Sequence, residues 1–385
     1  MTTRPRMDVQ VEPVAGAGDL DDFLRLPYRL YADEPHYVFP LLREQKAFFD
    51  PGHNPFFAHA DTRLWLARRR SGGGRPRVVG RVGACVDRYH NEHSGEKTGF
   101  FGFFECEDDP VTACALLDAA RGWVAEHGME ILRGPASFTT NHDYLGLLVD
   151  GYDKDPVVGM PYQPPYYATL LEDYGLYKAM DLYAWDLDTG GTVPEKLQRF
   201  MDRIMATATF TIRPFRMDRF WEDASIVREI YNEAWSRNWG FIPLDDAEFA
   251  YLAKDMKSMV DPSFLLIAEN DEGRPIGFAL SVPDFNQALK PLRGKLFPFG
   301  WLRFLLAKRR IRMARTLLMG VRPEYRNKGV DAALVYRTMQ ATFPKGIARG
   351  ECSWVLETNR PMNIVMRSYG GVKTKTYRIY EMPAS

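Results

Sequence analysis

The sequence predicts an α/β protein with mixed sheets, in which two similar domains follow one another. Its 385 residues exceed the roughly 150 residues of one ordinary domain. Apolar residues make up 45% and charged residues 26% of the chain, as is typical of globular proteins. The same order of strands and helices also occurs twice. We therefore expect two mixed-sheet α/β domains in tandem.

The first copy of this order occupies the N-terminal half. Alternating apolar residues indicate strands, longer amphipathic stretches indicate helices, and Asp19 is a suitable N-cap for the first helix. The predicted elements are strand Val9–Val14, helix Leu20–Leu30, strands Thr62–Arg68, Val78–Asp87 and Gly99–Glu105, helix Pro110–His127 and strand Ile131–Phe138.

The second copy lies in the C-terminal half. Its predicted elements are strand Thr211–Pro214, helix Trp221–Trp235, strands Phe264–Glu269, Ile276–Val282 and Thr316–Val321, helix Asp331–Phe343 and strand Ser353–Glu357. The hairpins "GRPRVVGRVGACV" and "GRPIGFALSV" correspond, with Gly80 and Gly277 in equivalent places. Gly, Thr and Pro in "DTGGTVP" break the pattern. The sequence thus predicts domains at 1–190 and 191–385.

Charge and cysteine usage narrow the function classes. Lys plus Arg and Asp plus Glu both total 50, so net charge gives no reason to expect a nucleic-acid partner. None of the four cysteines forms a CxxC pair, and we expect neither a metal site nor a disulfide framework. The N-terminus lacks a signal-peptide pattern, and no apolar run reaches the ~18 residues of a spanning helix. We expect a cytoplasmic protein.

A Gly-containing loop between an apolar strand and a helix lies within Leu317–Asp331. Backbone N–H groups at a helix N-terminus bind phosphate. Arg326 and Lys328 add positive charge, and Gly329 permits close approach of a ligand to the backbone. These features predict a phosphate-binding loop; an ordinary surface turn is the alternative.

The sequence "VRPEYRNKGVDAAL" resembles the acyl-CoA loop of GNAT acyltransferases, whose pattern is Arg/Gln-x-x-Gly-x-Gly/Ala. The resemblance implies two tandem GNAT-like acyltransferase domains and acyl-CoA, either acetyl-CoA or a longer-chain acyl-CoA, as co-substrate. The implied cofactor-binding residues are Met319, Val321, Arg326, Asn327, Lys328, Gly329, Val330, Asp331 and Ala332. Asp331 departs from the pattern, although Asp is also a good helix N-cap.

The N-terminal half resembles the same fold without this loop. At its corresponding junction, "CEDDP", the residues Glu107, Asp108 and Asp109 would repel a pyrophosphate. We expect a degenerate N-terminal domain that binds no CoA and that shapes the acceptor side.

The family reaction is direct attack of an amine on a thioester, which needs a nearby base. Glu357 ends the last predicted strand, and Asn359 aligns with a family Asn in "SWVLETNRPMNIVMRSYGGV". Met366 falls where many members have the Tyr that protonates the departing thiolate. A surface or helix-capping carboxylate is the alternative for Glu357. His142, oriented by Asp143, is a second candidate base; a solvated loop is its alternative.

A basic and apolar segment, Leu296–Arg315, precedes the loop. From Phe285 to Pro323 the chain has ten basic residues and no acidic one. Aromatic residues beside basic ones are typical of helices that lie on anionic membranes, so we expect peripheral attachment to the inner face of the membrane. A helix packed on the other domain is the alternative.

Three stretches, "PDFNQALK", "LFPFGWL" and "MGVRPEYRNKG", resemble the group of tandem GNAT proteins that includes the bacterial ceramide synthase. The resemblance implies an N-acyltransferase that transfers an acyl group from acyl-CoA to a long-chain, sphingoid-like amine at the membrane surface. Two alternatives stay open: an acyltransferase or aminoacyltransferase for a small polar amine, and a non-catalytic lipid- or CoA-binding module.

Overall fold

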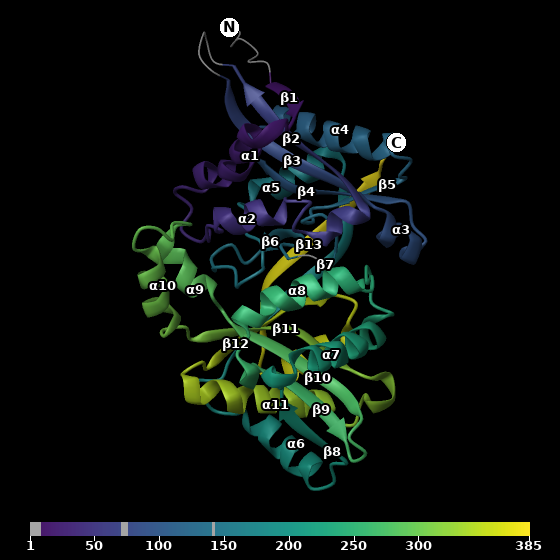
Figure 1. Ribbon diagram of the computed structural model, residues 1–385, viewed down its shortest axis with the longest axis vertical. Coiled ribbons are helices and arrows are strands. Elements are labelled where there is room, and N and C mark those ends of the chain that lie inside the picture. The colour runs from purple at the N-terminus through teal and green to yellow at the C-terminus, as the bar shows by residue number, and fades with distance from the viewer. Residues whose placement is uncertain (1–8, 71–75, 141–142) are drawn as a thin grey trace. The chain divides into compact units, whose positions relative to one another are not determined.

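The computed structural model describes residues 9–70, 76–140 and 143–385, and it confirms a mixed α/β fold (Figure 1). The chain divides into two compact units. The first unit contains residues up to Asp181 together with Leu292–Leu296 and Thr376–Ser385. The second unit contains Leu182–Pro291 and Phe297–Lys375.

The sheet of the first unit has the strand order β1-β2-β3-β4-β5-β13. Its strands are β1 Val9–Pro13, β2 Ala60–Arg69, β3 Arg77–Asp87, β4 Thr98–Cys106, β5 Ile131–Gly134, β6 Leu147–Asp150 and the C-terminal strand β13, Val372–Pro383. Its helices are α1 Gly16–Leu30, α2 Leu42–Phe48, α3 Arg88–Ser94, α4 Pro110–Glu126 and α5 Tyr166–Tyr174. Helix α4 covers the sheet and supplies Leu116, Leu117 and Ala120 to the main apolar core.

The second unit has the order β7-β12-β11-β10-β9-β8. Its strands are β7 Tyr177–Asp188, β8 Phe210–Pro214, β9 Leu265–Asn270, β10 Pro275–Pro283, β11 Met313–Val321 and β12 Arg349–Leu356. Its helices are α6 Glu195–Met205, α7 Phe220–Trp235, α8 Asp246–Met259, α9 Asn286–Leu289, α10 Gly300–Lys308, α11 Val330–Thr342 and α12 Arg360–Ser368.

Helices cover both faces of this second sheet. Side chains of successive strand residues point to opposite faces. In β9, Leu266 and Ala268 share a core cluster with residues of α6, α11 and α12. Leu265 and Ile267 share another with residues of α7 and α8. Helices α7 and α11 therefore lie on opposite faces of the sheet.

Two strands pass from one unit to the other along the chain. The last part of β7, from Leu182 to Asp188, pairs with β12 in the second unit. The last part of β13 pairs with β5 and β6 in the first unit, for example Tyr380 with Gly134. The predicted division into 1–190 and 191–385 stays a prediction, whereas the compact units of the structure exchange these segments.

Gly80 and Gly277, which were expected to be equivalent from the two hairpin sequences, occupy matching positions in the structure. Gly80 in β3 pairs with Cys106, the last residue of β4. Gly277 in β10 pairs with Val321, the last residue of β11. A side chain at Gly80 would collide with Leu116 of α4, and one at Gly277 would crowd Val330 of α11. In both units, a glycine lets the following helix pack closely on the sheet.

Several predicted boundaries were wrong. The first helix begins at Gly16 with Ala15 as its N-cap, so Asp19 lies inside its first turn and is not the N-cap. The strand predicted to begin at Thr316 begins at Met313. The strand predicted to reach Phe138 ends at Gly134, because Pro135 has no N–H for the ladder and Phe138 adopts a positive φ of 77°. The strand predicted to begin at Ser353 begins at Arg349, where pairing with both β7 and β11 extends it. Helix α11 begins at Val330 with Gly329 as its N-cap, so Asp331 lies inside the first turn and is not the N-cap.

Candidate functional site

Strands β11 and β12 separate halfway along their length. They pair in parallel from Met313 to Thr316 on β11 and from Arg349 to Cys352 on β12, and the ladder stops there. Each strand has an irregularity at that point: β11 has an extra residue at Leu317 opposite β10, and β12 has one after Cys352 opposite β7. A bulge bends its strand and increases its twist. The two bulges therefore accompany the opening of a gap between the strands.

Side-chain hydrogen bonds engage backbone groups at the edges of this gap. The Arg315 guanidinium donates to the carbonyl and the hydroxyl oxygen of Ser353, at 3.0–3.2 Å. The Trp235 indole donates to the Met319 carbonyl at 3.1 Å. These donors satisfy strand groups that the interrupted ladder leaves without a strand partner.

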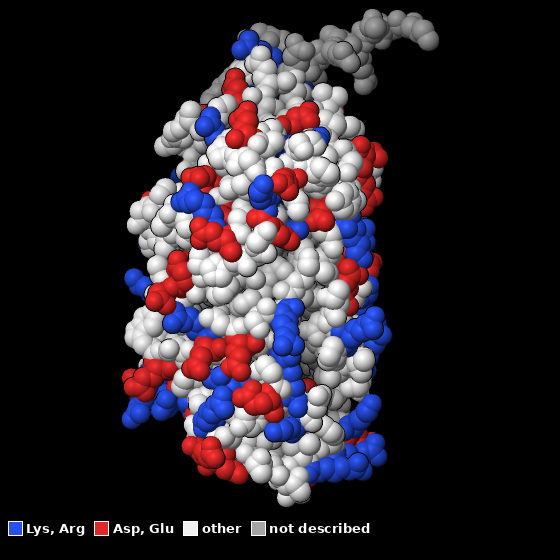
Figure 2. Space-filling view, turned by 90° about the vertical axis from the view of Figure 1, so that its right-hand side faces the viewer, with Lys and Arg blue, Asp and Glu red and all other residues white. Residues whose placement is uncertain are grey.

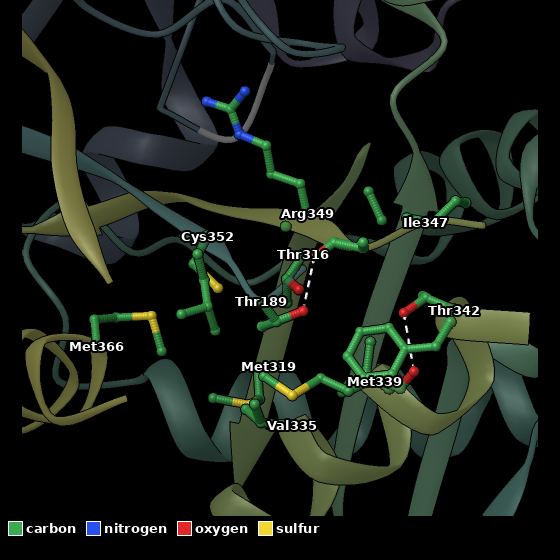
Figure 3. Close-up of a pocket in the computed structure, with 17 residues that line it drawn as sticks. Thr189, Thr316, Met319, Val335, Met339, Thr342, Ile347, Arg349, Cys352 and Met366 are labelled. Atoms are coloured by element: carbon green, nitrogen blue, oxygen red, sulfur yellow. Dashed lines mark hydrogen bonds between the residues drawn. The ribbon is translucent and has the colours of Figure 1, made fainter. Parts of the chain in front are cut away.

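One cavity lies on each side of the gap. The first lies between the sheet and α11 and is open to solvent (Figure 3). The second, also open to solvent, is bordered by Trp235 at the end of α7. Thr316, Met319 and Cys352 line both cavities. Since α7 and α11 cover opposite faces, the cavities approach each other through the sheet.

The N-terminus of α11 lies beside the open end of β11. In any α-helix the first N–H groups have no partner within the helix. The first bond inside α11 runs from Ala333 N to the Gly329 carbonyl oxygen, and Gly329 has no side chain to cap the preceding N–H groups. Asn327 and Gly329 both adopt a left-handed backbone, with φ of 61° and 80°. The loop and first turn thus present backbone donors suited to an anion.

The predicted basic residues of the loop are partly engaged elsewhere. Arg326 donates to the Ala234 carbonyl oxygen at the end of α7, at 2.7 Å. The Lys328 ammonium lies 4.8 Å from the centre of the Tyr325 ring. A side chain at Gly329 would meet Ile204 of α6. The place expected for close approach of a ligand at Gly329 is therefore occupied on the Cα side by α6.

Asp331 influences a neighbouring tyrosine. Burial, together with the charge of Asp331, raises the pKa of Tyr369 to about 12. The Tyr369 hydroxyl is therefore neutral at physiological pH. Met366, which the sequence resemblance aligns with the family Tyr, is buried and lines the first cavity, where its thioether has no proton to donate.

Glu357 and Asn359 lie just after β12. Glu357 is half-buried in the turn, and its carbonyl oxygen accepts a hydrogen bond from Asn363. Asn359 is the N-cap of α12: its side-chain oxygen accepts from Met362 N at 3.3 Å, and the residue also lines the second cavity. The structure therefore brings Asn359 to the same cavity as Met319, while giving it a clear role in helix capping.

The other two predicted catalytic residues belong to the first unit. His142 lies outside the described residues, and Asp143 is exposed. Residues that the sequence analysis missed include Trp354 and Trp235, whose rings lie 6.3 Å apart in the second unit and which both line the second cavity. The available signals were Trp354 near the start of the predicted strand Ser353–Glu357 and Trp235 at the end of the predicted helix Trp221–Trp235.

In the first unit the corresponding gap is filled. Strand β4 pairs in parallel with β5 only from Thr98 to Phe100. The chain after β5 then returns to β4, where Ala136 N donates to the Phe101 carbonyl oxygen at 2.9 Å. A side chain at Gly102 would lie 1.6 Å from the Ala136 carbonyl oxygen. Backbone occupies this gap directly.

The helix after β4 is also capped. The Asp109 carboxylate accepts from Thr112 N at the start of α4, and Arg69 pairs with it. Glu107 pairs with Arg29 and Arg77. The sequence alone predicts that these carboxylates repel a pyrophosphate as unneutralised charges. The structure shows that arginines offset two of them, so the capped N-terminus and the filled gap are the stronger differences.

The basic, apolar segment is exposed around α10. Six large apolar side chains, which we call the apolar patch, are Phe297, Phe299, Trp301, Leu302, Leu305 and Leu306. Phe297 is 81% exposed and Phe299 71%. Only the Phe304 side of α10 packs inward, against Phe285.

Eight of the ten predicted basic residues are not buried, namely Lys290, Arg293, Lys295, Arg303, Lys308, Arg309, Arg310 and Arg312. Arg315 and Arg322 were wrongly grouped with them. Arg315 is buried against Ser353, and Arg322 is buried and paired with Glu229 and Glu233. Figure 2 shows a different side of the molecule from the one that carries α10 in Figure 1, and basic and acidic side chains are interspersed there. No helix of the described residues is long and apolar enough to cross a bilayer.

Comparison with models of known protein families gave no match. Among curated proteins, the chain is 37% identical over 381 residues to the bacterial ceramide synthase of Caulobacter vibrioides (strain NA1000 / CB15N), with 97% of each chain covered. It is also 37% identical over 370 residues to Protein YghO of Escherichia coli (strain K12), with 94% of this chain and 92% of that protein covered.

Solved structures show the same fold. A tandem GNAT protein from the clavulanic acid biosynthesis pathway superimposes with a TM-score of 0.58 at 16% identity, covering 98% of this chain and 99% of that one. A GCN5-related N-acetyltransferase from Sphaerobacter thermophilus gives 0.52 at 12% identity, covering 97% and 96%. The chain has this fold and is 37% identical to both curated relatives over nearly its full length. It is therefore an acyltransferase of the tandem GNAT type and belongs to the family of the bacterial ceramide synthase.

Proposed function

We propose that this protein transfers a fatty acyl group from acyl-CoA to the amino group of a long-chain, sphingoid-like amine. The observation that carries the proposal is the gap between β11 and β12, which lies beside the helix N-terminus of α11 and has a cavity on each side. The name of the Caulobacter relative supports the acyl acceptor.

In this proposal, the residues of the loop hold the donor. Backbone N–H groups of residues 328–332 bind the pyrophosphate, and Lys328 adds a positive charge. Met319 and Val321 on the open part of β11 border the pantetheine arm. Because Arg326 is hydrogen-bonded to Ala234, it positions the loop against α7 and does not need to reach a phosphate.

Bound acyl-CoA supplies an activated carbonyl carbon. The amine nitrogen forms a bond to that carbon, the carbon–sulfur bond breaks, and CoA leaves as the thiol. Glu357 accepts the proton that the amine loses, and Asn359 keeps the turn after β12 in place by capping α12. The proton that the sulfur gains comes from water, since Met366 offers none.

The test is an assay of purified protein with a panel of acyl-CoA donors and amine acceptors, read by mass spectrometry. We expect an amide of a long-chain amine as the main product. Glu357→Gln should lower kcat by about 10²-fold or more and leave CoA affinity unchanged. Glu324→Gln, on the exposed side of the same unit, is the matched control. Acylation of water-soluble amines alone would reject the long-chain acceptor.

A membrane location follows from the same acceptor, because a long-chain amine resides in the bilayer. The apolar patch on and before α10 is suited to the bilayer interface, with Lys308, Arg309 and Arg310 beside it. Contiguous exposed apolar side chains in a soluble protein mark a binding surface.

Liposome co-sedimentation tests this attachment. Binding should require anionic lipid and weaken as salt rises, because salt screens surface charge over about 10 Å at ~0.1 M. Replacing Phe297, Phe299 and Trp301 with Ser should abolish binding even at low salt. Replacing Lys308, Arg309, Arg310 and Arg312 with Gln should weaken it and spare the fold. Equal binding of all variants would show that the segment does not contact lipid.

A further inference from the structure

We propose that the cavity between α11 and the sheet holds the hydrocarbon chain of the donor thioester, and that Val335 and Met339 limit the length of the chain. The inference rests on the proposed function and makes it more specific. It names the part of the donor that this cavity selects: an acyl chain longer than acetyl.

The polar groups that line the cavity are already satisfied. Thr189 donates to the Ala348 carbonyl oxygen, Thr338 to that of Leu334 and Thr342 to that of Met339, at 2.8–3.1 Å. The Thr316 hydroxyl bonds to Ser281 at 2.9 Å.

Arg349 pairs with Asp186, and Figure 3 shows its guanidinium directed away from the cavity. Since each of these side chains already bonds to the protein, a polar ligand would gain little here. A ligand without polar groups would lose no hydrogen bond on entering.

The walls of the cavity are apolar and adaptable. Met319, Met339 and Met366 lie around it with Val335 (Figure 3). Methionine side chains are flexible and fill irregular space, so they accommodate a chain that can bend. Cys352 adds no charge, because burial raises the pKa of its thiol to about 11.

The shape of the cavity matches a chain that enters from the gap. Met319 and Cys352 mark its entrance, because they also line the cavity on the other face. From there it follows α11 from Val335 to Phe343, which is about 12 Å at a rise of 1.5 Å per residue. The thioester would lie in the gap and the hydrocarbon chain beneath the helix.

A cavity of this kind makes the reaction depend on chain length. Each methylene that leaves water for an apolar site favours binding by up to about fourfold. The preference should rise with chain length until the cavity is full. Val335 lies where the cavity begins to follow α11, close to the entrance. A larger side chain there would leave room for a short acyl group in the gap and would keep a longer chain from passing beneath the helix.

The experiment compares the wild type with Val335→Phe and Val335→Ala across acyl-CoA donors from acetyl to long chains. We expect Val335→Phe to lower kcat/KM for the longest donors at least tenfold and to change it less than threefold for the shortest. Val335→Ala widens the entrance, so kcat/KM for the longest donors should stay at least at the wild-type value. Gln340→Phe introduces the same ring on the exposed side of α11 and should leave the length profile unchanged.

Binding provides a second readout. Calorimetry with CoA and with a long-chain alkyl-CoA thioether, which cannot react, measures how much the chain adds to affinity. That added affinity should fall at least tenfold in Val335→Phe. Equal loss for all donors in the folded variant, or no change in either measurement, would overturn the cavity assignment. Absence of acyl transfer by the wild type with every donor would instead reject the proposed function.

Discussion

The two units contain the same strand-loop-helix arrangement, with opposite results at the gap. In the second unit the gap between β11 and β12 is bordered by two cavities. In the first unit the chain after β5 folds back into the equivalent gap and bonds to Phe101. The N-cap of α11 in the second unit is Gly329, which has no side chain. The N-cap of α4 in the first unit is Asp109, whose carboxylate caps the helix. A shared fold therefore does not imply a shared site, because a few residues decide whether the gap stays open.

The largest effect should be on catalysis and should come from closing the gap between β11 and β12. Cys352→Phe places a ring where both cavities meet, and we expect kcat/KM to fall at least 100-fold. Cys352→Ala should keep activity within about tenfold, because the neutral thiol, with its pKa raised to about 11, is a poor nucleophile. Steady-state kinetics with a thermal melt as fold control measures both. Full activity of the Phe variant would show that the gap is not the reaction site.

The second-largest effect should be on the free energy of unfolding, at the ion pairs that anchor α7 to the sheet of the second unit. In the second unit the Asp223 side chain is fully buried and accepts from Arg213 and Arg216. Their hydrogen bonds hold the pKa of Asp223 at about 2, below its ordinary value near 3.8. Its contribution is present above pH ~4 and is lost as the pH falls toward 2. Asp223→Asn should lower the free energy of unfolding by about 2 kcal/mol at pH 7.

The first unit provides the matched control. Arg68 joins β2 to α1 through Asp19 and Asp22, whose side chains are 28% and 38% exposed. The Arg68 side chain is itself 16% exposed. Both carboxylates remain in contact with water, which weakens the pairs, so Arg68→Met should cost about 1 kcal/mol, less than Asp223→Asn. Urea unfolding of both variants at pH 7 and pH 3 checks the comparison. A larger loss for the Arg68 variant, or an Asp223 effect that does not shrink in acid, would contradict it.

A single negative charge added to the loop before α11 should have a smaller effect, measured as CoA affinity. Asn327 has a left-handed backbone, which Asp also tolerates. Asn327→Asp therefore adds a carboxylate without changing shape. It should weaken CoA binding about fivefold or more, as expected for ~1 kcal/mol of repulsion. This change is more informative than one at Gly329, where strain and Ile204 would disturb the fold. Gln340→Glu adds the same charge at the far end of α11 and should not affect calorimetric affinity.

The smallest effect on CoA binding should come from the capped helix of the first unit. Asp109→Ala removes the cap of α4 and should lower the free energy of unfolding by about 1 kcal/mol. CoA affinity should not change, and calorimetry should give one CoA per chain before and after. A second CoA in the wild type, or altered affinity in the variant, would mean that the first unit also binds CoA.

Local patterns predicted the repeated elements well. Both hairpins, both long helices after the fourth strand of each copy, and the matching positions of Gly80 and Gly277 were visible in residue order. The loop before α11 was visible for the same reason, since strand, glycine and helix are adjacent in the chain. Arg315 and Arg322 were misplaced because burial depends on partners such as Ser353 and Glu233, which lie 38 and 89 residues away.

The sequence by itself determined the α/β class, the repeat and the resemblance of the loop, because each depends on neighbouring residues. Only the tertiary structure decided which strands complete each sheet: β13 lies beside β5 although Tyr380 follows Gly134 by 246 residues. It also decided that one gap is open and the other filled. Whether Ala136 reaches Phe101, or whether a cavity remains beneath α11, depends on packing between distant segments, and no periodicity along the chain reports such contacts.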